Sequence, residues 1–208
     1  MSSNNKEIEL KIKISNKQLS LLEKWLGNNA KYKGEEQQID TYFDHPKLKL
    51  VNKNDRGFVD ATDYFRIRTE INKERNREKI STCVKHFYED PENPGHYSHC
   101  DEFETNIEDG KILVKLYKAL GFAETCVVNK KRKSYQYKNF EFDIDEVKGL
   151  GVFVEIELKT DVDDPKKGKA MIYKLLKKIS ISDFILTFRG YVSMIWNPEV
   201  NFGEKISI

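Results

Sequence analysis

Charged and apolar residues alternate with a period of two in many segments of this chain. In residues 7–14 the odd positions are Glu or Lys and the even positions are Ile or Leu. This alternation predicts a strand with one buried face. Further strands are predicted at residues 38–43, 64–69, 80–87, 101–107, 127–137, 140–147 and 152–158.

Helical spacing of apolar residues is confined to a few segments. We predict a short helix capped by Asn16 and ended by Gly27, and a second with a stripe of Ile112, Leu113, Leu116 and Leu120. Asp164-Pro165 opens a third helix over 166–179, and a last helical stretch is predicted at 184–196, interrupted at Gly190. Strands therefore outnumber helices. The sequence predicts a single α+β domain spanning 1–208, an eight-stranded antiparallel β-barrel with flanking helices.

The balance of charged residues bears on whether the protein binds nucleic acid. The 208 residues include 36 Lys+Arg and 34 Asp+Glu, which leaves a net charge of +2. A simple basic nucleic-acid binder normally carries a large positive excess, so we expect no nucleic-acid partner. The basic runs at 73–79 and 130–133 are interpreted as a solvated hairpin tip and as strand alternation. An aromatic content of 12% supplies core-forming material and excludes a disordered tail.

Other sites and locations are disfavoured by the same reading. The three cysteines contain no C-x-x-C pair, and His96, His99 and Cys100 lack a zinc-site spacing. Gly149-Leu150-Gly151 lacks the length and the Lys-Ser/Thr ending of a P-loop. No stretch reaches the roughly 18 apolar residues of a membrane span, and no apolar leader is seen. We expect a cytoplasmic protein with no membrane partner.

Charged residues of like sign recur on one face of several predicted strands. Carboxylates recur at i, i+2 in Glu7/Glu9, Asp143/Asp145 and Glu155/Glu157, and long cations recur in the same way on other strands. On any single strand a solvated face is the simpler interpretation. If several such faces lined the inside of a barrel, their charged groups would need counter-ions or other partners, because removing an ion from water costs several kcal/mol. Carboxylates would recruit Mg²⁺ or Mn²⁺, and Lys and Arg would bind phosphate.

A family resemblance rests on motifs in order along the chain. Glu7-Ile8-Glu9-Leu10-Lys11 matches the E-x-E-x-K signature of the CYTH superfamily, the triphosphate tunnel metalloenzymes. The resemblance covers residues 7 to about 195 and is strongest to the branch that contains class IV adenylyl cyclases. The other matching segments are 38–44 (QIDTYFD), 65–68 (FRIR), Lys85, 102–105 (EFET), 130–132 (KKR) and 145–157 (DEVKGLGVFVEIE).

The resemblance implies a site and a reaction. It implies Mg²⁺ or Mn²⁺ held by carboxylates, triphosphate bound by Lys and Arg, and conversion of ATP to cyclic AMP and pyrophosphate. Alternatives are hydrolysis of inorganic, thiamine or nucleoside triphosphate, and a non-catalytic polyphosphate or nucleotide sensor. Dimers are common in that branch, so a homodimer is expected by analogy. The implied metal ligands are Glu7, Glu9, Asp145, Glu155 and Glu157; the triphosphate ligands are Lys11, Arg66, Arg68, Lys85, Lys130 and Arg132; the catalytic set is Glu7, Glu9, Lys11, Glu155 and Glu157.

Two segments depart from the cyclase-like pattern. Cys100 stands two residues before the first Glu of the 102–104 strand, where that branch commonly carries Arg. The C-terminal region reads Arg189-Gly190-Tyr191-Val192-Ser193 in place of a Ser-Tyr pair followed by an aliphatic helix. The closure of the tunnel is therefore expected to differ. Arg189 is either a surface residue or an additional phosphate ligand.

Overall fold

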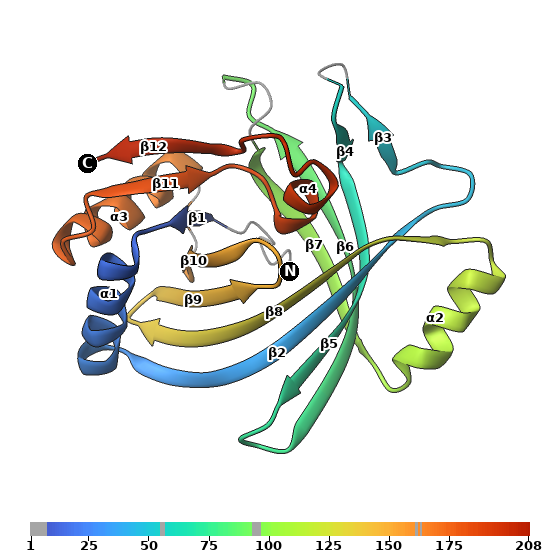
Figure 1. Cartoon of the computed structure of the whole chain (residues 1–208), viewed down its shortest axis with the longest axis horizontal. Coiled ribbons are helices and arrows are strands. Elements are labelled where there is room, and N and C mark those ends of the chain that lie inside the picture. The colour runs from blue at the N-terminus through green and yellow to red at the C-terminus, as the bar shows by residue number, and fades with distance from the viewer. Residues whose placement is uncertain (1–7, 55–56, 93–96, 161, 163) are drawn as a thin grey trace.

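One antiparallel sheet of ten strands dominates the structure (Figure 1). The computed structural model describes residues 8–54, 57–92, 97–160, 162 and 164–208. The strand order is β12-β11-β1-β10-β9-β8-β2-β5-β6-β7. Their bounds are β1 Glu9–Lys13, β2 Lys31–Asp44, β5 Asp63–Asn72, β6 Arg77–Glu89, β7 Tyr97–Ile107, β8 Ala123–Tyr137, β9 Phe140–Val147, β10 Gly151–Leu158, β11 Asp183–Thr187 and β12 Gly203–Ser207; a separate hairpin pairs β3 Val51–Lys53 with β4 Val59–Ala61.

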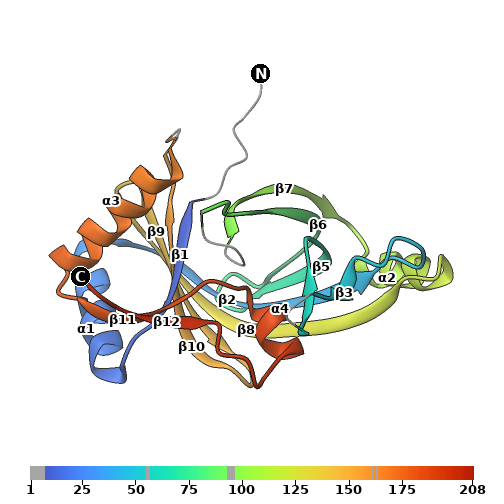
Figure 2. The same ribbon diagram turned by 90° about the horizontal axis from the view of Figure 1, so that it is seen from above.

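The sheet curls strongly but does not close. Its two outer strands are β12 and β7, and they do not pair with each other in the described residues. Figure 2 shows the two halves of the sheet curving toward each other. The predicted α+β class with antiparallel strands is confirmed, but the predicted closed barrel of eight strands is wrong. A closed barrel requires its end strands to hydrogen-bond, and the order here ends in two unpaired edges.

Three helices, α1–α3, lie outside the curled sheet, whereas α4 borders its interior. The bounds of the helices are α1 Asn16–Asn29, α2 Gly110–Ala119, α3 Pro165–Lys178 and α4 Tyr191–Trp196. The cap of α1 is Ser15 rather than the predicted Asn16, because the Ser15 hydroxyl accepts from the Gln18 amide while the Gln18 side chain accepts from the Ser15 amide. The helix also continues through Gly27. Asp164 caps α3 as predicted.

The segment predicted as a last helix is divided between a strand and a short helix. Residues 183–187 form β11, which pairs with β1 on one side and β12 on the other. Only the six residues after Gly190 are helical, as α4. The run Phe184-Ile185-Leu186 is apolar without a period, and such a run fits a buried strand as well as a helix. Pairing with distant residues decides between the two.

The two faces of the sheet differ in chemistry. The outer face under α1 and α3 packs an apolar core whose fully buried members include Ile12, Leu26, Phe142, Val154 and Ile172. Burying one such side chain contributes roughly 1.5–3 kcal/mol. The inner face of the same strands carries charged residues. The alternation predicted from the sequence therefore separates a dry core from a polar interior.

Helix α3 packs closely against the residue that precedes β1. A side chain at Gly168 would put its Cβ 2.8 Å from Ile8 and 3.5 Å from Leu158. Only glycine allows the helix to approach this closely. Glu9 and Lys11 follow Ile8 along the chain. The packing of α3 on Ile8 therefore helps to position the Glu9 and Lys11 side chains.

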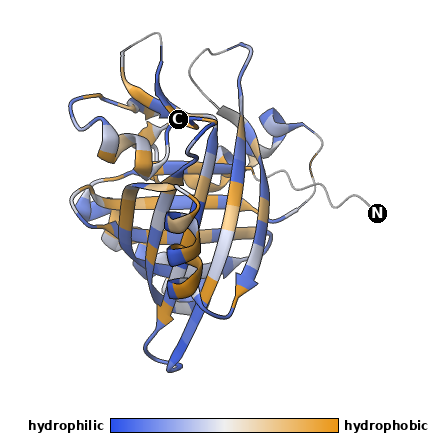
Figure 3. Cartoon of the chain, turned by 90° about the vertical axis from the view of Figure 1, so that its right-hand side faces the viewer, coloured by the Kyte–Doolittle hydropathy of each residue, from blue (hydrophilic) through white to orange (hydrophobic). Residues whose placement is uncertain are grey.

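Three of the four apolar residues predicted as the inward stripe of α2 face away from the core, whereas the fourth, Leu113, is half-buried. Ile112, Leu116 and Leu120 are 49%, 53% and 68% exposed. The buried contact is made instead by Tyr117, whose ring packs against Phe43 and Phe65 of the sheet. Figure 3 shows this helix lying on the outside of the curled strands. Of the described helices, none combines the length and apolarity that a membrane crossing requires.

Candidate active site

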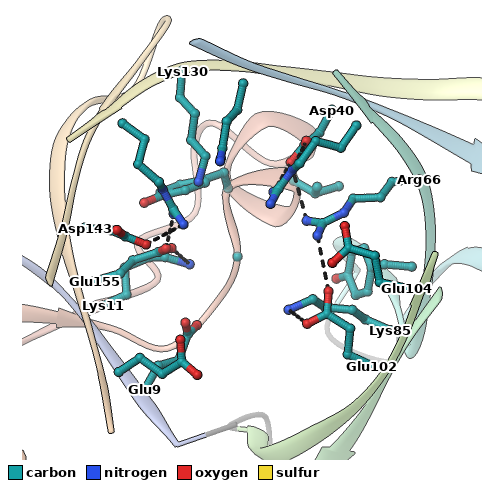
Figure 4. A pocket seen from close by; sticks show the side chains of 18 of the residues that line it. Glu9, Lys11, Asp40, Arg66, Lys85, Glu102, Glu104, Lys130, Asp143 and Glu155 are labelled. Atoms are coloured by element: carbon teal, nitrogen blue, oxygen red, sulfur yellow. Dashed lines mark hydrogen bonds and ion pairs between the residues drawn. The ribbon is translucent and has the colours of Figure 1, made fainter. Parts of the chain in front are cut away.

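The concave side of the sheet encloses a cavity of about 420 Å³. Eight of the ten strands supply lining residues, namely β1, β2 and β5–β10. Residues of α4 also line the cavity. Figure 4 shows charged side chains entering from opposite sides. The lining comprises Glu9, Lys11, Glu36, Gln38, Asp40, Tyr42, Tyr64, Arg66, Arg68, Glu70, Lys85, Phe87, Glu102, Glu104, Lys130, Arg132, Ser134, Glu141, Asp143, Glu155, Glu157, Lys159, Gly190, Tyr191 and Val192.

One side of the cavity is built around Arg132. Its guanidinium donates from Nε and NH2 to Asp145 at 2.7 and 2.6 Å, and NH1 lies 2.6 Å from Asp143. It also pairs with Glu155, whose other oxygen lies 3.0 Å from Lys11 Nζ. Lys130 Nζ lies 2.7 Å from Asp145. We call this set the Arg132 cluster: Lys11, Lys130, Arg132, Asp143, Asp145 and Glu155.

The facing side is built around Asp40. Arg68 donates to both Asp40 oxygens, at 2.6 Å from Nε and 2.7 Å from NH2, which is a bidentate pair. Arg66 lies between Asp40, at 3.5 Å, and Glu102, at 3.3 Å. Lys85 Nζ is 2.9 Å from the other Glu102 oxygen. We call this set the Asp40 cluster: Asp40, Arg66, Arg68, Lys85 and Glu102.

Burial and pairing shift the pKa values of these groups. Burial alone would raise the pKa of the Asp40 carboxyl, but Arg68 and Arg66 outweigh it and lower that pKa to about 2. The pKa of Glu155 is held well below its usual range by Lys11 and Arg132 despite burial. Burial, followed by repulsion from Arg132, lowers the pKa of Lys130 to about 8. At neutral pH the two carboxylates therefore stay ionised, and Lys130 loses its proton more readily than an ordinary lysine.

Carboxylates outnumber cations along the cavity wall. Ten Asp and Glu residues line it against seven Lys and Arg residues. The two signs interleave, because each predicted phosphate ligand contacts a carboxylate. The sequence suggested larger separation of the signs by strand, since it does not show which residues meet across strands. An added polyanion would meet net negative charge here unless cations accompanied it.

Three of the five predicted metal ligands, Glu9, Glu155 and Glu157, line this cavity, and Asp145 does not. Glu9 on β1 is opposite Glu157 on β10 in the strand register, and Glu155 follows on the same face. Asp145 is fully buried, and its oxygens accept from Lys130, Arg132 and the Tyr191 hydroxyl. Glu7 lies outside the described residues. The described residues contain no group of three or more His, Cys, Asp or Glu side chains arranged to hold a metal.

The donor chemistry nevertheless fits a hard cation. Mg²⁺ is usually held by one or two carboxylates, with waters and substrate phosphate oxygens completing its shell. Glu9 and Glu157 supply carboxylate oxygens beside a cavity with excess negative charge. These two residues would hold the cation, and Glu155 lies next to them.

All six predicted phosphate ligands line the cavity. Sequence reasoning did not assign roles to Asp40, Glu102, Glu104 or Tyr191. The sequence carried one signal for the two glutamates, because their i, i+2 spacing puts both on one face of a strand; the structure shows that Phe103 between them faces outward, 64% exposed. Arg189 is buried, not a surface residue, and its guanidinium lies 3.2 Å from Asp60.

The C-terminal segment closes one end of the cavity. Tyr191 of α4 donates its hydroxyl proton to Asp145 at 2.9 Å, and its ring lies 4.3 Å from Lys11 Nζ. Ser193 and Tyr64 hydroxyls are 3.2 Å apart, and Trp196 stacks on the Tyr64 ring. The Gly-Tyr-Val-Ser sequence thus builds the closure that was expected to depart from the usual pattern.

Comparison with known proteins places this architecture in a family. The sequence profile of the CYTH domain family matches residues 5–191. A protein of Methanocaldococcus jannaschii named "putative adenylate cyclase" is 28% identical over 195 residues, which cover 90% of this chain and 97% of that protein.

Solved structures share the fold. A Pyrococcus horikoshii protein superposes with a TM-score of 0.71 at 24% identity, covering 93% of this chain and 99% of that one. A Hippeastrum protein, whose structure is described as a putative adenylyl cyclase with dominant triphosphatase activity, has a TM-score of 0.60 at 17% identity over 94% and 97% of the two chains. The family match spans nearly the whole curled sheet and its charged cavity, and the chain belongs to the CYTH domain family.

Proposed function

We propose that this protein is a divalent-metal-dependent enzyme that converts ATP to cyclic AMP and pyrophosphate. The observation that carries the proposal is the convergence of six cations from β1, β5, β6 and β8 on one cavity, with carboxylates Glu9 and Glu157 at its side. Enzymes of the CYTH family act on triphosphates with divalent metals. The name of the Methanocaldococcus relative supports the cyclase reaction.

The chain's cations bind and orient the triphosphate in this proposal. Arg66 and Lys85 contact Glu102 from one side of the cavity, and Lys11 contacts Glu155 from the other. A triphosphate between the two sides would replace carboxylate partners with phosphate oxygens. The ribose 3′-hydroxyl gives up its proton to water, and its oxygen then bonds to the α-phosphorus while the bond from that phosphorus to the pyrophosphate oxygen breaks. Fixed cations stabilise the charge that builds on the departing pyrophosphate.

Metal dependence follows from the excess of carboxylates. A triphosphate brings several negative charges to a wall on which ten carboxylates already face seven cations. Divalent cations between Glu9, Glu157 and the phosphates would compensate this repulsion. When bound, such a metal also lowers the pKa of the attacking hydroxyl.

Hydrolysis is the second candidate. The Hippeastrum protein has the same fold, and its described dominant activity is that of a triphosphatase. In this chain α4 closes one end of the cavity. A closed end suits a substrate whose terminal phosphate is buried, and a water directed at the terminal phosphorus would release orthophosphate.

One product analysis separates the candidates. The purified protein is incubated with Mn²⁺ and ATP, and separately with Mn²⁺ and tripolyphosphate, and the products are resolved by chromatography. Cyclic AMP is the expected product from ATP. Orthophosphate without cyclic AMP would favour the triphosphatase, and tight binding without either product would support a sensor. Absence of binding to both compounds would contradict the whole proposal.

A further inference from the structure

Helix α2 and the segment between β2 and β3 lie together at the end of the molecule opposite α1 (Figure 1 and Figure 2). The His45 ring meets the Phe122 ring edge-on, with the ring centroids 5.0 Å apart, and this contact joins the segment to the residues that follow the helix. The amides of Lys47 and Leu48 donate to His45 Nδ1 at 3.1 and 3.0 Å. These bonds hold residues 45–48 as a compact turn, so the turn and the helix form one surface.

Large apolar side chains on this surface are exposed to solvent. Ile112, Leu116 and Leu120 are spaced by four residues along α2 and its C-cap, which puts them on one face of the helix. Leu48 at the turn is 70% exposed, more than any other large apolar side chain among the described residues. We call these four residues and the lysines next to them the α2 surface; the lysines are Lys47, Lys49, Lys111 and Lys115.

The α2 surface carries a net positive charge. Three of its four apolar residues directly follow an exposed lysine in the sequence. Residues 45–50 and 108–120 together contain five lysines and two acidic residues. The exposed apolar side chains are therefore bordered by cations, which favour an anionic partner.

Nearby carboxylates do not cancel this charge. Asp109 accepts from the Ile112 amide at 2.9 Å as the cap of α2, where it compensates the positive end of the helix dipole. Glu124 lies 3.3 Å from Lys118, so that pair is close to neutral. Within the described part of the chain, the four lysines of the α2 surface form no ion pair. Their charges are available to a partner.

A protein partner fits this surface poorly. Stable protein interfaces bury about 20–30 residues on each side, whereas the α2 surface lies at one tip of the molecule and offers four large apolar side chains. A symmetric contact between two copies would also gather the lysines of both copies in one interface. The repulsion between these like charges opposes such a contact.

The surface of an anionic bilayer fits the same features. A helix that lies in the membrane interface buries its apolar side chains at the boundary between headgroups and acyl chains. Lysines near that boundary are attracted to anionic headgroups, and their long side chains reach the phosphates from the border of the helix. A short row of exposed aliphatic residues bordered by lysines meets both requirements.

We propose that the α2 surface binds a bilayer that carries anionic headgroups, with α2 parallel to the membrane plane. Leu48, Leu116 and Leu120 then enter the boundary of the acyl chains. The inference is independent of the proposed function, because no residue of the α2 surface lines the charged cavity. It also changes the expectation drawn from the sequence, which considered a membrane span and an apolar leader. An interfacial helix requires neither.

Vesicle sedimentation tests the proposal. The full chain is mixed at low ionic strength with vesicles of phosphatidylcholine alone, or of phosphatidylcholine and phosphatidylserine in equal parts, and the bound fraction is measured. We expect the partition coefficient to be at least about tenfold higher for the anionic vesicles. Added KCl should lower it, because salt screens the attraction between the lysines and the headgroups.

Single substitutions locate the contact. Leu116→Asp puts a carboxylate on the exposed face of α2 and should lower the partition coefficient for anionic vesicles at least about tenfold. Leu48→Asp should act in the same way from the turn, and it tests the proposal if the helix variant does not fold. Lys115→Glu should reduce the preference for anionic over neutral vesicles. Leu21→Asp is the matched control and should bind like the wild type, because Leu21 is about as exposed as Leu116 and lies on α1.

The remaining outcomes overturn the inference. Equal partition of the wild type into both kinds of vesicle, or no partition at all, would exclude the anionic bilayer as the partner. Anionic binding that persists in folded Leu116→Asp and Leu48→Asp proteins would assign it to another surface. Wild-type dimers in light scattering that Leu116→Asp dissociates, without vesicle binding, would identify a second copy as the partner. None of these results bears on the proposed function, which the product analysis tests separately.

Discussion

The two sides of the charged cavity hold their arginines in different ways. In the Arg132 cluster every nitrogen of the Arg132 guanidinium contacts a carboxylate, drawn from Asp143, Asp145 and Glu155. In the Asp40 cluster, Arg66 contacts carboxylates through NH1 and NH2, at 3.5 and 3.3 Å, and its buried Nε has no hydrogen-bond partner among the described residues. All three nitrogens of Arg132 therefore contact carboxylates, whereas Arg66 has one donor, Nε, that remains available for a ligand.

This difference separates structural from binding roles. A saturated guanidinium neutralises carboxylates that the fold has already buried, so its removal leaves them without a counter-charge. A guanidinium with long contacts and a vacant donor can turn toward a phosphate at little cost to the fold. Arg132 should therefore matter most for stability, and Arg66 for substrate.

The largest effect is expected from Arg132→Met. Three buried carboxylates lose a cation, and the free energy of unfolding in urea should fall by about 3–5 kcal/mol. Arg66→Met is the matched control and should lose about 1 kcal/mol, because Asp40 keeps Arg68 and Glu102 keeps Lys85. Equal losses in the two variants would remove the distinction between the clusters.

The pKa of Asp40 gives the next effect. The folded pKa of about 2 lies below the usual 3.8, so the ionised form stabilises the fold. This contribution, about 2 kcal/mol, is fully present above about pH 4 and is lost as the pH falls through the folded pKa. Acid titrations of unfolding free energy should show this slope. Asp40→Asn should flatten it, and a slope that persists unchanged in that variant would assign the effect to other carboxylates.

Arg66→Ala should impair catalysis more than folding. We expect kcat/KM to fall at least about tenfold, or ~1.4 kcal/mol of transition-state stabilisation, while the variant stays folded, with a loss of unfolding free energy near the roughly 1 kcal/mol expected for Arg66→Met. Arg66→Lys keeps the charge but loses the planar donor set, so it should restore only part of the activity. Wild-type kinetics in Arg66→Ala would exclude this arginine from the substrate site.

Glu9→Ala tests the metal side of the cavity. Turnover should fall at least about tenfold, and the Mn²⁺ concentration for half-maximal rate should rise, because one proposed metal carboxylate is removed. Glu146→Ala is the control, since Glu146 is exposed on β9 and does not line the cavity. An unchanged Mn²⁺ requirement in Glu9→Ala would contradict the assignment of this residue.

Alternation along single strands predicted much of this site. It assigned the inner faces of β1, β5, β8 and β10, and every described residue of the predicted phosphate set lines the cavity. It could not show that Asp40 joins Arg68 or that Glu102 joins Lys85, because those contacts depend on the register between strands. The strand β12 and the open sheet edges likewise depend on long-range pairing that no local pattern contains.

Helix faces were predicted less well than strand faces. In α2 the apolar stripe at Ile112, Leu116 and Leu120 is the exposed side, and the packing is carried by Tyr117. Apolar residues around much of the helix leave the sequence with more than one plausible inward face. The aromatic residues Phe43 and Phe65 on the sheet select the one that contains Tyr117.

The surplus of carboxylates in the cavity makes substrate binding a form of ion exchange. The cations already hold protein carboxylates as counter-ions, so in the proposed function an incoming triphosphate would displace side chains of the protein rather than ions of the buffer. Proteins that bind polyanions on exposed basic surfaces release solvent ions and lose affinity steeply with salt. Here the affinity should respond weakly to KCl and strongly to the divalent metal that neutralises the displaced carboxylates.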